Sequence, residues 1–348
     1  MPTGNSQLQV SRQNTSRESF PTPGIPQLPQ NTPAAWTTFA DYVTTFGQAM
    51  LRCYGERIHK IAINADFTCP NRDGSKGRGG CSFCNNASFS PNGPHPASIP
   101  AQIEAGKNVI RKRTRAQRYI AYFQAYTNTY ASIDKLRASY DQALSQEDVV
   151  GLSVGTRPDC VTPEIIKLLA AYRNEGLEIW LELGLQSSFD DTLARVDRGH
   201  TFADYRKAVD IAHKHDLKVC THLMIGLPGE EKTHACTTLK RVLSQGVEGL
   251  KIHPLHVVRG TRLAVQWQSK EYTPLEFSDY VDTVCDLIEI TPVEVIYHRL
   301  TGTASSNILL APAWCRKKWQ VLNAIKRELE LRNTCQGFYA DTDRACQH

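Results

Sequence analysis

Strand-like and helix-like segments alternate along this chain from Trp36 onward, and this alternation restricts the fold more than any other feature. Apolar residues recur at every second position in the strand-like segments and at helical spacing between them. Six such pairs predict parallel strands joined by helical crossovers. Because such crossovers are right-handed, the units should curl into an α/β fold, a partial (β/α)6 TIM-like barrel.

The predicted element boundaries follow from the same patterns. The predicted strands are 58–67, 118–124, 148–155, 178–185, 218–225 and 249–255, and the predicted helices are 99–113, 130–145, 163–174, 202–215 and 231–243. Thr162 followed by Pro163 predicts a capped helix start, and Gly176 predicts a helix end. In barrels of this kind functional residues collect at the carboxyl ends of the strands, on the loops that follow them.

Alternation within each strand sorts side chains into those that face the helices and those that face the barrel interior. In EIWLELGLQ the apolar face predicts an inward position for Trp180, Glu182, Gly184 and Gln186, and the same reasoning places Asn64, Asp66, Cys220, His222, Met224, Lys251 and His253 inside. Polar groups in an interior are costly unless they are paired or bind something. The set therefore predicts a binding cavity, with a self-satisfied polar network as the alternative.

Three cysteines follow the first predicted strand in the segment CPNRDGSKGRGGCSFC. Eleven residues separate Cys69 from Cys81 and two separate Cys81 from Cys84, so a glycine-rich loop can bring all three thiols together. Three thiolates on one site predict a metal centre with one coordination position left open. An open position is typical of a catalytic metal, whereas a structural metal normally has four protein ligands.

These motifs resemble those of the radical S-adenosylmethionine (SAM) superfamily and, more closely, its YhcC family, which is related to the Elongator catalytic subunit and oxygen-independent coproporphyrinogen oxidase. The resemblance runs from about Trp36 to about Gly337 and includes VGTRPDC, WLELGLQS, DRGHTF, HLMIGLPGE and VIYHRL. It implies that Cys69, Cys81 and Cys84 hold a [4Fe-4S] cluster whose fourth iron binds SAM. The implied reaction is reductive cleavage of SAM to a 5′-deoxyadenosyl radical, which abstracts hydrogen from an unknown substrate.

The same resemblance implies which residues contact SAM. Gln186 matches a SAM-contacting position, and Arg198 in DRGH matches an arginine that holds the SAM carboxylate through its planar fork. The segment 124–128, QAYTN, stands where the superfamily has a glycine-rich turn, which brings in Gln124, Thr127 and Asn128. The remaining candidate cofactor residues are Thr156, Arg157, Glu182 and His222. The implied reaction also needs an electron donor such as flavodoxin or ferredoxin.

Composition sets the broader expectations. Residues 1–35 are rich in Pro, Ser, Thr, Asn and Gln and predict a disordered tail, before a core barrel at 36–290 and a C-terminal extension at 291–348 that covers the barrel. No apolar stretch approaches the length of a membrane helix. Eleven cysteines, most of them isolated within apolar or helical segments, favour free thiols and a cytoplasmic location.

Two other features leave alternatives open. The run RKRTRAQR at 111–118 holds five basic and no acidic residues, which fits either a solvated helix end or an RNA contact. Cys53 could join the three loop cysteines in a four-cysteine zinc site of a non-catalytic, RNA-associated protein. However, Cys53 precedes the first strand, so it should lie at the opposite end of the barrel and not be a ligand.

Overall fold

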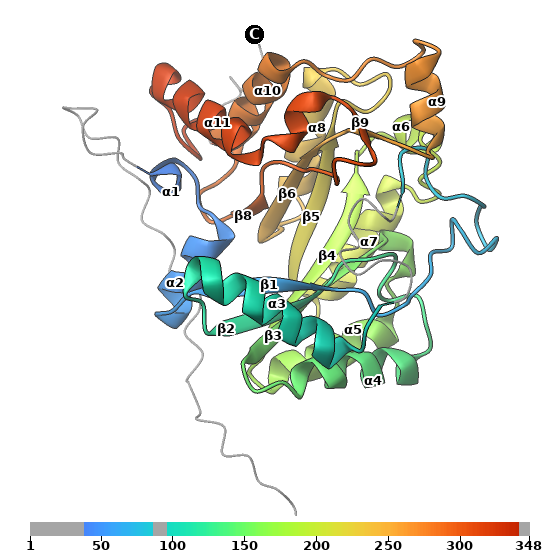
Figure 1. The fold of residues 1–348 in the computed structure, drawn as a ribbon, viewed down its shortest axis with the longest axis vertical. Coiled ribbons are helices and arrows are strands. Elements are labelled where there is room, and N and C mark those ends of the chain that lie inside the picture. The colour runs from blue at the N-terminus through green and yellow to red at the C-terminus, as the bar shows by residue number, and fades with distance from the viewer. Residues whose placement is uncertain (1–37, 86–95, 341–348) are drawn as a thin grey trace, which may run out of the picture.

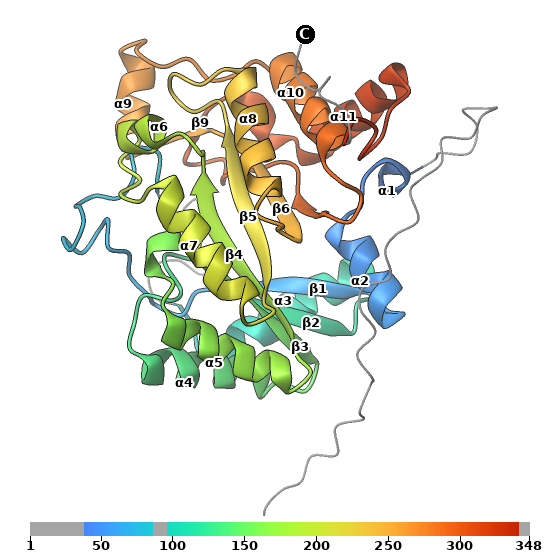
Figure 2. The same ribbon diagram turned by 180° about the vertical axis from the view of Figure 1, so that it is seen from behind.

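The computed structural model describes residues 38–85 and 96–340 of the 348-residue chain, so the predicted tail at 1–35 lies outside the described residues. Seven parallel strands form one curled sheet in the order β1-β2-β3-β4-β5-β6-β8. Helices cover its outer face (Figure 1, and from behind in Figure 2). The strands are β1 (Ile58–Ile63), β2 (Arg118–Phe123), β3 (Val149–Thr156), β4 (Glu178–Gln186), β5 (Lys218–Ile225), β6 (Gly249–Pro254) and β8 (Ile296–Arg299).

The predicted α/β partial barrel is confirmed, and the structure adds a seventh strand to the six that were predicted. Strand β8 comes from the segment assigned to the C-terminal extension and pairs in parallel with β6. Its register slips between Leu250 and Lys251, so that Lys251 pairs with Arg299 and His298 is skipped. This irregularity alters which side chains of β8 face the interior.

The predicted strand faces agree with the core. Ile179, Leu181, Leu183 and Leu185 belong to the large cluster that packs under the helices. Trp180 instead joins a smaller cluster inside the barrel, together with Phe46 and Met50 of α2 (Phe46–Tyr54) and Cys220 of β5. Helix α2 thus fills the end of the barrel where the strands begin, and the opposite end remains for the loops.

The helices lie close to where the sequence places them. The crossover helices are α3 (Ile99–Thr114), α4 (Ile133–Leu144), α5 (Pro163–Asn174), α7 (Phe202–His213) and α8 (Lys232–Leu243). Helix α4 begins three residues later than predicted because the Ser132 side chain caps it, accepting a hydrogen bond from the Lys135 amide. The predicted cap at Thr162 is present, and Gly176 adopts a φ of 88° just after α5.

The first strand is shorter than predicted and ends at Ile63, so the predicted inward position of Asp66 is wrong and this residue is exposed. The Asn64 side chain accepts a hydrogen bond from the amide of Asp66, and Asp66 has a φ of 54°, so the chain turns before reaching Phe67. The turn directs the following loop across the carboxyl ends of the neighbouring strands.

The remaining elements pack at the side and mouth of the barrel. They are α1 (Phe39–Tyr42), the 3₁₀ turns η3 (Pro158–Cys160) and η4 (Ala313–Arg316), α6 (Asp190–Arg195), β7 (Val257–Val258), α9 (Arg262–Gln268), α10 (Phe277–Ile290), β9 (Leu309–Ala311) and α11 (Lys318–Arg332). Arg332 joins α11 to α10 through Asp282, Asp286 and Glu289. In the described part of the chain, no helix has the length and apolar character that crossing a bilayer requires.

The described cysteines are mostly free thiols. Nine are free, six of them buried, in line with the prediction from their isolated positions. Cys236 on α8 is disulfide-bonded, so the prediction of free thiols is wrong for that residue.

Candidate metal centre and cofactor site

The cysteine loop is folded back on itself directly after β1. The amides of Arg72 and Asp73 both donate to the Cys69 carbonyl, at 2.8 and 3.2 Å, which makes a tight turn at the first cysteine. The Gly80 amide donates to the Asn71 carbonyl at 2.9 Å and returns the chain to that turn. Gly79 and Gly80 have φ values of 84° and 89°, a backbone that residues with a Cβ rarely adopt. Cys81 therefore follows immediately after the point of return.

Nitrogen donors surround the loop thiols. Cys81 is buried and lies 3.4 Å from Arg198 Nη1 and 3.5 Å from Asn71 Nδ2, measured to its Sγ atom. Cys84 Sγ lies 3.5 Å from Arg72 Nη2, which also donates to the Cys84 carbonyl at 2.8 Å. Burial and the neighbouring Cys81 raise the pKa of the Cys84 thiol, while Arg72 acts against them. Donors of this kind stabilise metal thiolates.

The three loop thiols are not gathered as closely as the ligands of a single metal ion. Ligands of one zinc ion are about 2.3 Å from it, so their sulfurs lie within about 4.6 Å of one another. Among the described residues, a set of three ligand atoms this close, all within 4.8 Å, is found at Glu182, Cys220 and His222 and not at the loop cysteines. Thiolates of an iron–sulfur cluster bind different irons and can be farther apart.

Cys53 lies away from the other three cysteines. It is exposed on α2, and its thiol pKa is raised by partial burial first, with Lys218 and Glu178, the first residues of β5 and β4, and Arg52 of α2 also acting on it. Lys218 and Glu178 mark the amino ends of the strands, whereas the cysteine loop crosses the carboxyl ends. A four-cysteine site that includes Cys53 is therefore not assembled in this structure.

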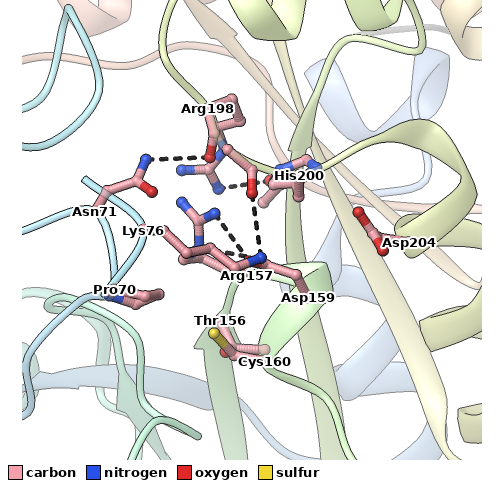
Figure 3. A network of polar contacts seen from close by, with 12 residues as sticks. Pro70, Asn71, Lys76, Thr156, Arg157, Asp159, Cys160, Arg198, His200 and Asp204 are labelled. Atoms are coloured by element: carbon pink, nitrogen blue, oxygen red, sulfur yellow. Dashed lines mark hydrogen bonds and ion pairs between the residues drawn. The ribbon is translucent and has the colours of Figure 1, made fainter. Parts of the chain in front are cut away.

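The predicted cofactor residues at the carboxyl ends of β3 and β4 come together beside the loop (Figure 3). Arg198 Nη2 donates to the Gly184 carbonyl at 2.6 Å, while Arg157 is ion-paired with Asp159. Lys76 of the cysteine loop also pairs with Asp159, at 2.5 Å. The segments that follow β3 and β4 thus meet the cysteine loop at one place.

The end of β2 joins the same place. The Thr127 amide donates to the Thr68 carbonyl, next to Cys69, and the Gln124 amide donates to the Ile63 carbonyl, both at 3.2 Å. Asn128 is fully buried and donates to the Phe123 and Gly155 carbonyls. Thr156 bonds to Thr129 at 2.6 Å. The QAYTN segment therefore borders the first cysteine.

Four buried polar atoms here have no partner within the protein. Two are acceptors, Gln186 Oε1 and Asn128 Oδ1, and two are donors, Arg157 Nη1 and Arg198 Nε. Buried polar atoms are nearly always hydrogen-bonded, so this group indicates a ligand that supplies both donors and acceptors. An amino-acid moiety, with an ammonium and a carboxylate, has this combination. The residues present therefore fit the methionine part of SAM.

Glu182 and His222 lie deeper in the interior and are engaged with other protein groups. Glu182 is fully buried and accepts hydrogen bonds from Lys60 Nζ at 2.6 Å, from His222 Nε2 at 2.7 Å, and from Ser153 and Lys251. Burial alone would raise the pKa of Glu182, but Lys251 and Lys60 outweigh it and hold that pKa well below its usual range. Two ammonium groups beside this carboxylate also disfavour a cation at Glu182, Cys220 and His222.

Several residues of this network escaped the sequence analysis as functional candidates. Lys60 and Ala62 alternate with Ile61 and Ile63, which face the helices. The alternation along β1 could therefore have identified Lys60 as an inward residue. The alternation along β3 could have identified Ser153 in the same way. Burial lowers the pKa of Lys251 to about 7 and that of His222 to about 4. The interior of the barrel thus contains basic groups with strongly altered protonation.

Comparisons with known proteins agree with this geometry. Residues 73–242 match the family model described as the radical SAM superfamily, and residues 247–331 match the radical SAM C-terminal domain. The chain is 47% identical over 287 residues to Protein YhcC of Escherichia coli K12, covering 82% of this chain and 92% of that protein. It is 38% identical over 311 residues to YtqA of Bacillus subtilis, an uncharacterized protein, covering 89% and 96% of the two chains.

A solved structure supports the fold. The Elp3 protein of the archaeon Methanocaldococcus infernus superimposes with a TM-score of 0.61 at 18% identity, covering 80% of this chain. The match covers 64% of the Elp3 chain, less than two thirds of it, and at this identity it bears on the fold alone.

Proposed function

This chain belongs to the radical SAM superfamily, in the family of YhcC, and we propose that it is an iron–sulfur oxidoreductase or transferase that uses SAM to begin a radical reaction on a substrate still to be identified. When bound, a [4Fe-4S] cluster and SAM would supply one-electron cleavage of SAM to methionine and a 5′-deoxyadenosyl radical, which takes a hydrogen atom from the substrate. The observation that carries the proposal is the meeting of three loop thiols with four unpartnered buried polar atoms.

The residues of this chain have distinct parts in the proposal. Cys69, Cys81 and Cys84 would hold the cluster, and Arg72 and Asn71 would stabilise the sulfur charge. Arg198 is placed to contribute at two points, since it donates to Cys81 Sγ and leaves its Nε atom for the SAM carboxylate. Gln186, Asn128 and Arg157 would complete the contacts to the methionine part, with Gln124, Thr127 and Thr156 around them.

Glycines shape this site as well. A Cβ atom at Gly184 would lie 2.6 Å from Arg198 Nη2 and 3.0 Å from Gln186 Nε2, and one at Gly199 would lie 2.8 Å from Asn71 Oδ1. These positions leave room for the side chains proposed to bind SAM. The strand end can therefore approach the ligand closely.

The proposal also names partners and a location. The reaction needs one electron, for which a flavodoxin or a ferredoxin is the proposed donor. A cavity of about 670 Å³ beside the cysteine loop is lined by Pro70, Ser75 and Lys76 of the loop and by Tyr130 and Asp159. The prevalence of free thiols among the described cysteines favours a reducing, cytoplasmic compartment.

RNA modification is a second hypothesis for the substrate. Arg111, Lys112, Arg113 and Arg115 are exposed at the end of α3, although Arg111 pairs with Asp148 at 2.8 Å. If they bind RNA, replacing all four by Ser should weaken binding and reduce its dependence on salt. No measurable RNA affinity of the parent protein at low salt would remove this hypothesis.

Anaerobic reconstitution tests the main proposal. We expect a brown protein with about four irons per chain that releases 5′-deoxyadenosine and methionine when it is reduced in the presence of SAM. Cys81→Ala should lose the cluster and the release, whereas Cys53→Ala should retain both, because Cys53 lies at the other end of the barrel. Equal metal loss in the two variants, with zinc instead of iron in the parent, would support the four-cysteine zinc alternative and refute the enzyme.

A further inference from the structure

A row of basic side chains crosses the barrel interior just below the proposed SAM residues. Strand register places Gly184 of β4 beside His222 of β5, His222 beside Lys251 of β6, and Lys251 beside Arg299 of β8. The Arg198 side chain donates to the Gly184 carbonyl, and a Cβ atom at Gly184 would meet the Arg198 and Gln186 side chains. The row therefore lies directly against the proposed SAM site, on the side of the barrel interior.

Arg299 is the unusual member of this row. Strict alternation from the outward Tyr297 would place His298 inside and Arg299 outside. The register slip between β6 and β8 instead makes Arg299 the partner of Lys251, whose side chain faces inward to Glu182. Bulges of this kind commonly redirect a side chain next to a functional site. The pKa of His253 also indicates that Arg299 is close to this interior residue, because burial lowers that pKa most and Arg299 lowers it next.

The charges of this region do not balance. The Glu182 carboxylate is shared by Lys60 and Lys251, which bond to its two different oxygens. The Arg299 side chain has no hydrogen bond or ion pair to any residue that the structure describes. Like charges on neighbouring strand positions destabilise a sheet unless something is placed between them. Lys60 and Arg299 carry two positive charges against the one carboxylate of Glu182, and this excess favours an anion from outside the chain.

The row is also open to solvent on one side. The His222 side chain remains 16% exposed although β4 and β6 flank its strand, and the Lys60 side chain, on the edge strand β1, remains 14% exposed. Lys251 is only 3% exposed, so its ammonium group is mostly screened from water. A cation that has lost most of its hydration gains more from a bound anion than one at the surface does. Because strands flank His222 and Lys251 on both sides, a single oxyanion group of a small molecule suits the row better than the backbone of a polymer.

We propose that Arg299 and Lys251, with His222 beside them, bind an oxyanion group, a carboxylate or a phosphate, of a small-molecule substrate. This inference rests on the proposed function, since it assigns the substrate class of the same barrel. The arginine fork suits either group because it can donate two parallel hydrogen bonds. Bound in this way, the substrate lies between the basic row and the proposed SAM site, and its carbon skeleton faces SAM.

Binding of simple oxyanions tests the proposal. Inorganic phosphate and acetate are titrated separately into the cluster-containing, unreduced protein with SAM present, so that the SAM carboxylate already occupies Arg198. Line broadening of ³¹P and ¹³C signals reports binding, and the probe that saturates distinguishes a phosphate from a carboxylate. We expect one probe to bind saturably. Arg299→Met should weaken the binding of that probe at least about tenfold, because a charged hydrogen-bond pair is lost. Arg299→Lys should retain part of the affinity.

Arg327→Met provides the matched control, because Arg327 is an exposed arginine on α11. It should leave probe binding unchanged. Failure of both probes to saturate the wild-type protein overturns the proposal, and so does an equal loss in the Arg327→Met and Arg299→Met proteins.

A second measurement needs no variant and so does not depend on the folding of Arg299→Met. The saturating probe should protect His222, which is 16% exposed, from diethyl pyrocarbonate in the wild-type chain, read by peptide mass, while histidines away from the row, such as His215, stay reactive. Unchanged labelling of His222 overturns the proposal. Release of 5′-deoxyadenosine by the same preparation separates the two ideas: intact release without an anion site refutes only this inference, whereas no release refutes the proposed function.

Discussion

Buried polar groups have hydrogen-bond partners at the start of strand β4 but lack some of them at its end. At its start, the Glu178 carboxylate accepts hydrogen bonds from Tyr54, Trp180 and Lys218, each at 2.7 Å. At its end, the Oε1 atom of Gln186 and the Nε atom of the neighbouring Arg198 are both buried without a hydrogen-bond partner. An unpartnered buried group costs about 1–3 kcal/mol. The structure accepts that cost at the end where a ligand can supply the missing partners.

This contrast extends to the whole barrel. At the amino ends of the strands, α2 closes the interior with Phe46 and Met50 against Trp180. At the carboxyl ends, the cysteine loop, Arg157 and Arg198 meet around groups that protein contacts leave incomplete. One end is built for stability and the other for binding, the division expected of such barrels. Substitutions at the two ends should therefore differ in which property they change.

The largest expected effect comes from a methyl group at Gly151, near the start of β3. A Cβ there would lie 1.9 Å from the Glu178 carbonyl oxygen, which is backbone and cannot move away without shifting the strand. Gly151→Ala should therefore lower the free energy of unfolding by about 3 kcal/mol, measured by urea denaturation.

Gly184→Ala is the counterpart at the other end of the sheet. Its Cβ would meet the tips of the Arg198 and Gln186 side chains, which can turn aside. We expect a change in unfolding free energy below about 1 kcal/mol but at least a tenfold loss of SAM affinity. If Gly184→Ala unfolds the protein and Gly151→Ala does not, the proposed division of the barrel is wrong.

Removal of the Glu178 carboxylate should give the next largest effect. Glu178→Ala leaves Trp180, Tyr54 and the ammonium group of Lys218 without their shared acceptor. Because Lys218 is one-quarter exposed and can regain water, we expect a loss of about 2 kcal/mol in thermal or urea unfolding. SAM affinity, measured by equilibrium dialysis, should stay within twofold of that of the parent. A larger drop would show that a change at the amino ends of the strands affects binding at their carboxyl ends.

Arg198→Lys should change binding without changing stability. The substitution keeps the positive charge but removes the Nε atom that is left for the SAM carboxylate, so SAM affinity should fall about tenfold while iron content stays normal. Arg198→Ala should weaken SAM binding further. Unchanged SAM affinity in a cluster-replete Arg198→Ala protein would show that this arginine does not hold the SAM carboxylate.

The smallest expected effect is that of Tyr54→Phe. The Tyr54 hydroxyl donates to Glu178 at 2.7 Å, and burial followed by Glu178 raises the pKa of this tyrosine. Because Lys218 and Trp180 still satisfy the carboxylate, the loss should be about 1 kcal/mol or less in unfolding free energy. A cost as large as that of Glu178→Ala would mean that the tyrosine alone holds Glu178 in place.

The sequence alone predicted the α/β barrel, five of its crossover helices and the inward faces of β4, β5 and β6. It could do so because strand periodicity and helix caps are local signals, present in Trp180, Glu182 and Thr162 themselves. The cysteine loop was likewise readable, since Cys69 follows a strand and glycines mark the return of the chain. Which residues form the SAM site came from the resemblance to a family and stays a prediction.

Tertiary structure decided what each inward residue meets. Glu182 was expected near SAM, yet Lys60 and Lys251 from distant strands engage its carboxylate. Arg299 faces the interior because β8 slips by one residue against β6, and alternation along β8 alone points it the other way. Periodicity is a property of one strand, whereas register and pairing depend on two strands that meet only after folding. The sequence therefore determined which residues line the barrel, and the fold determined which of them are left to bind something else.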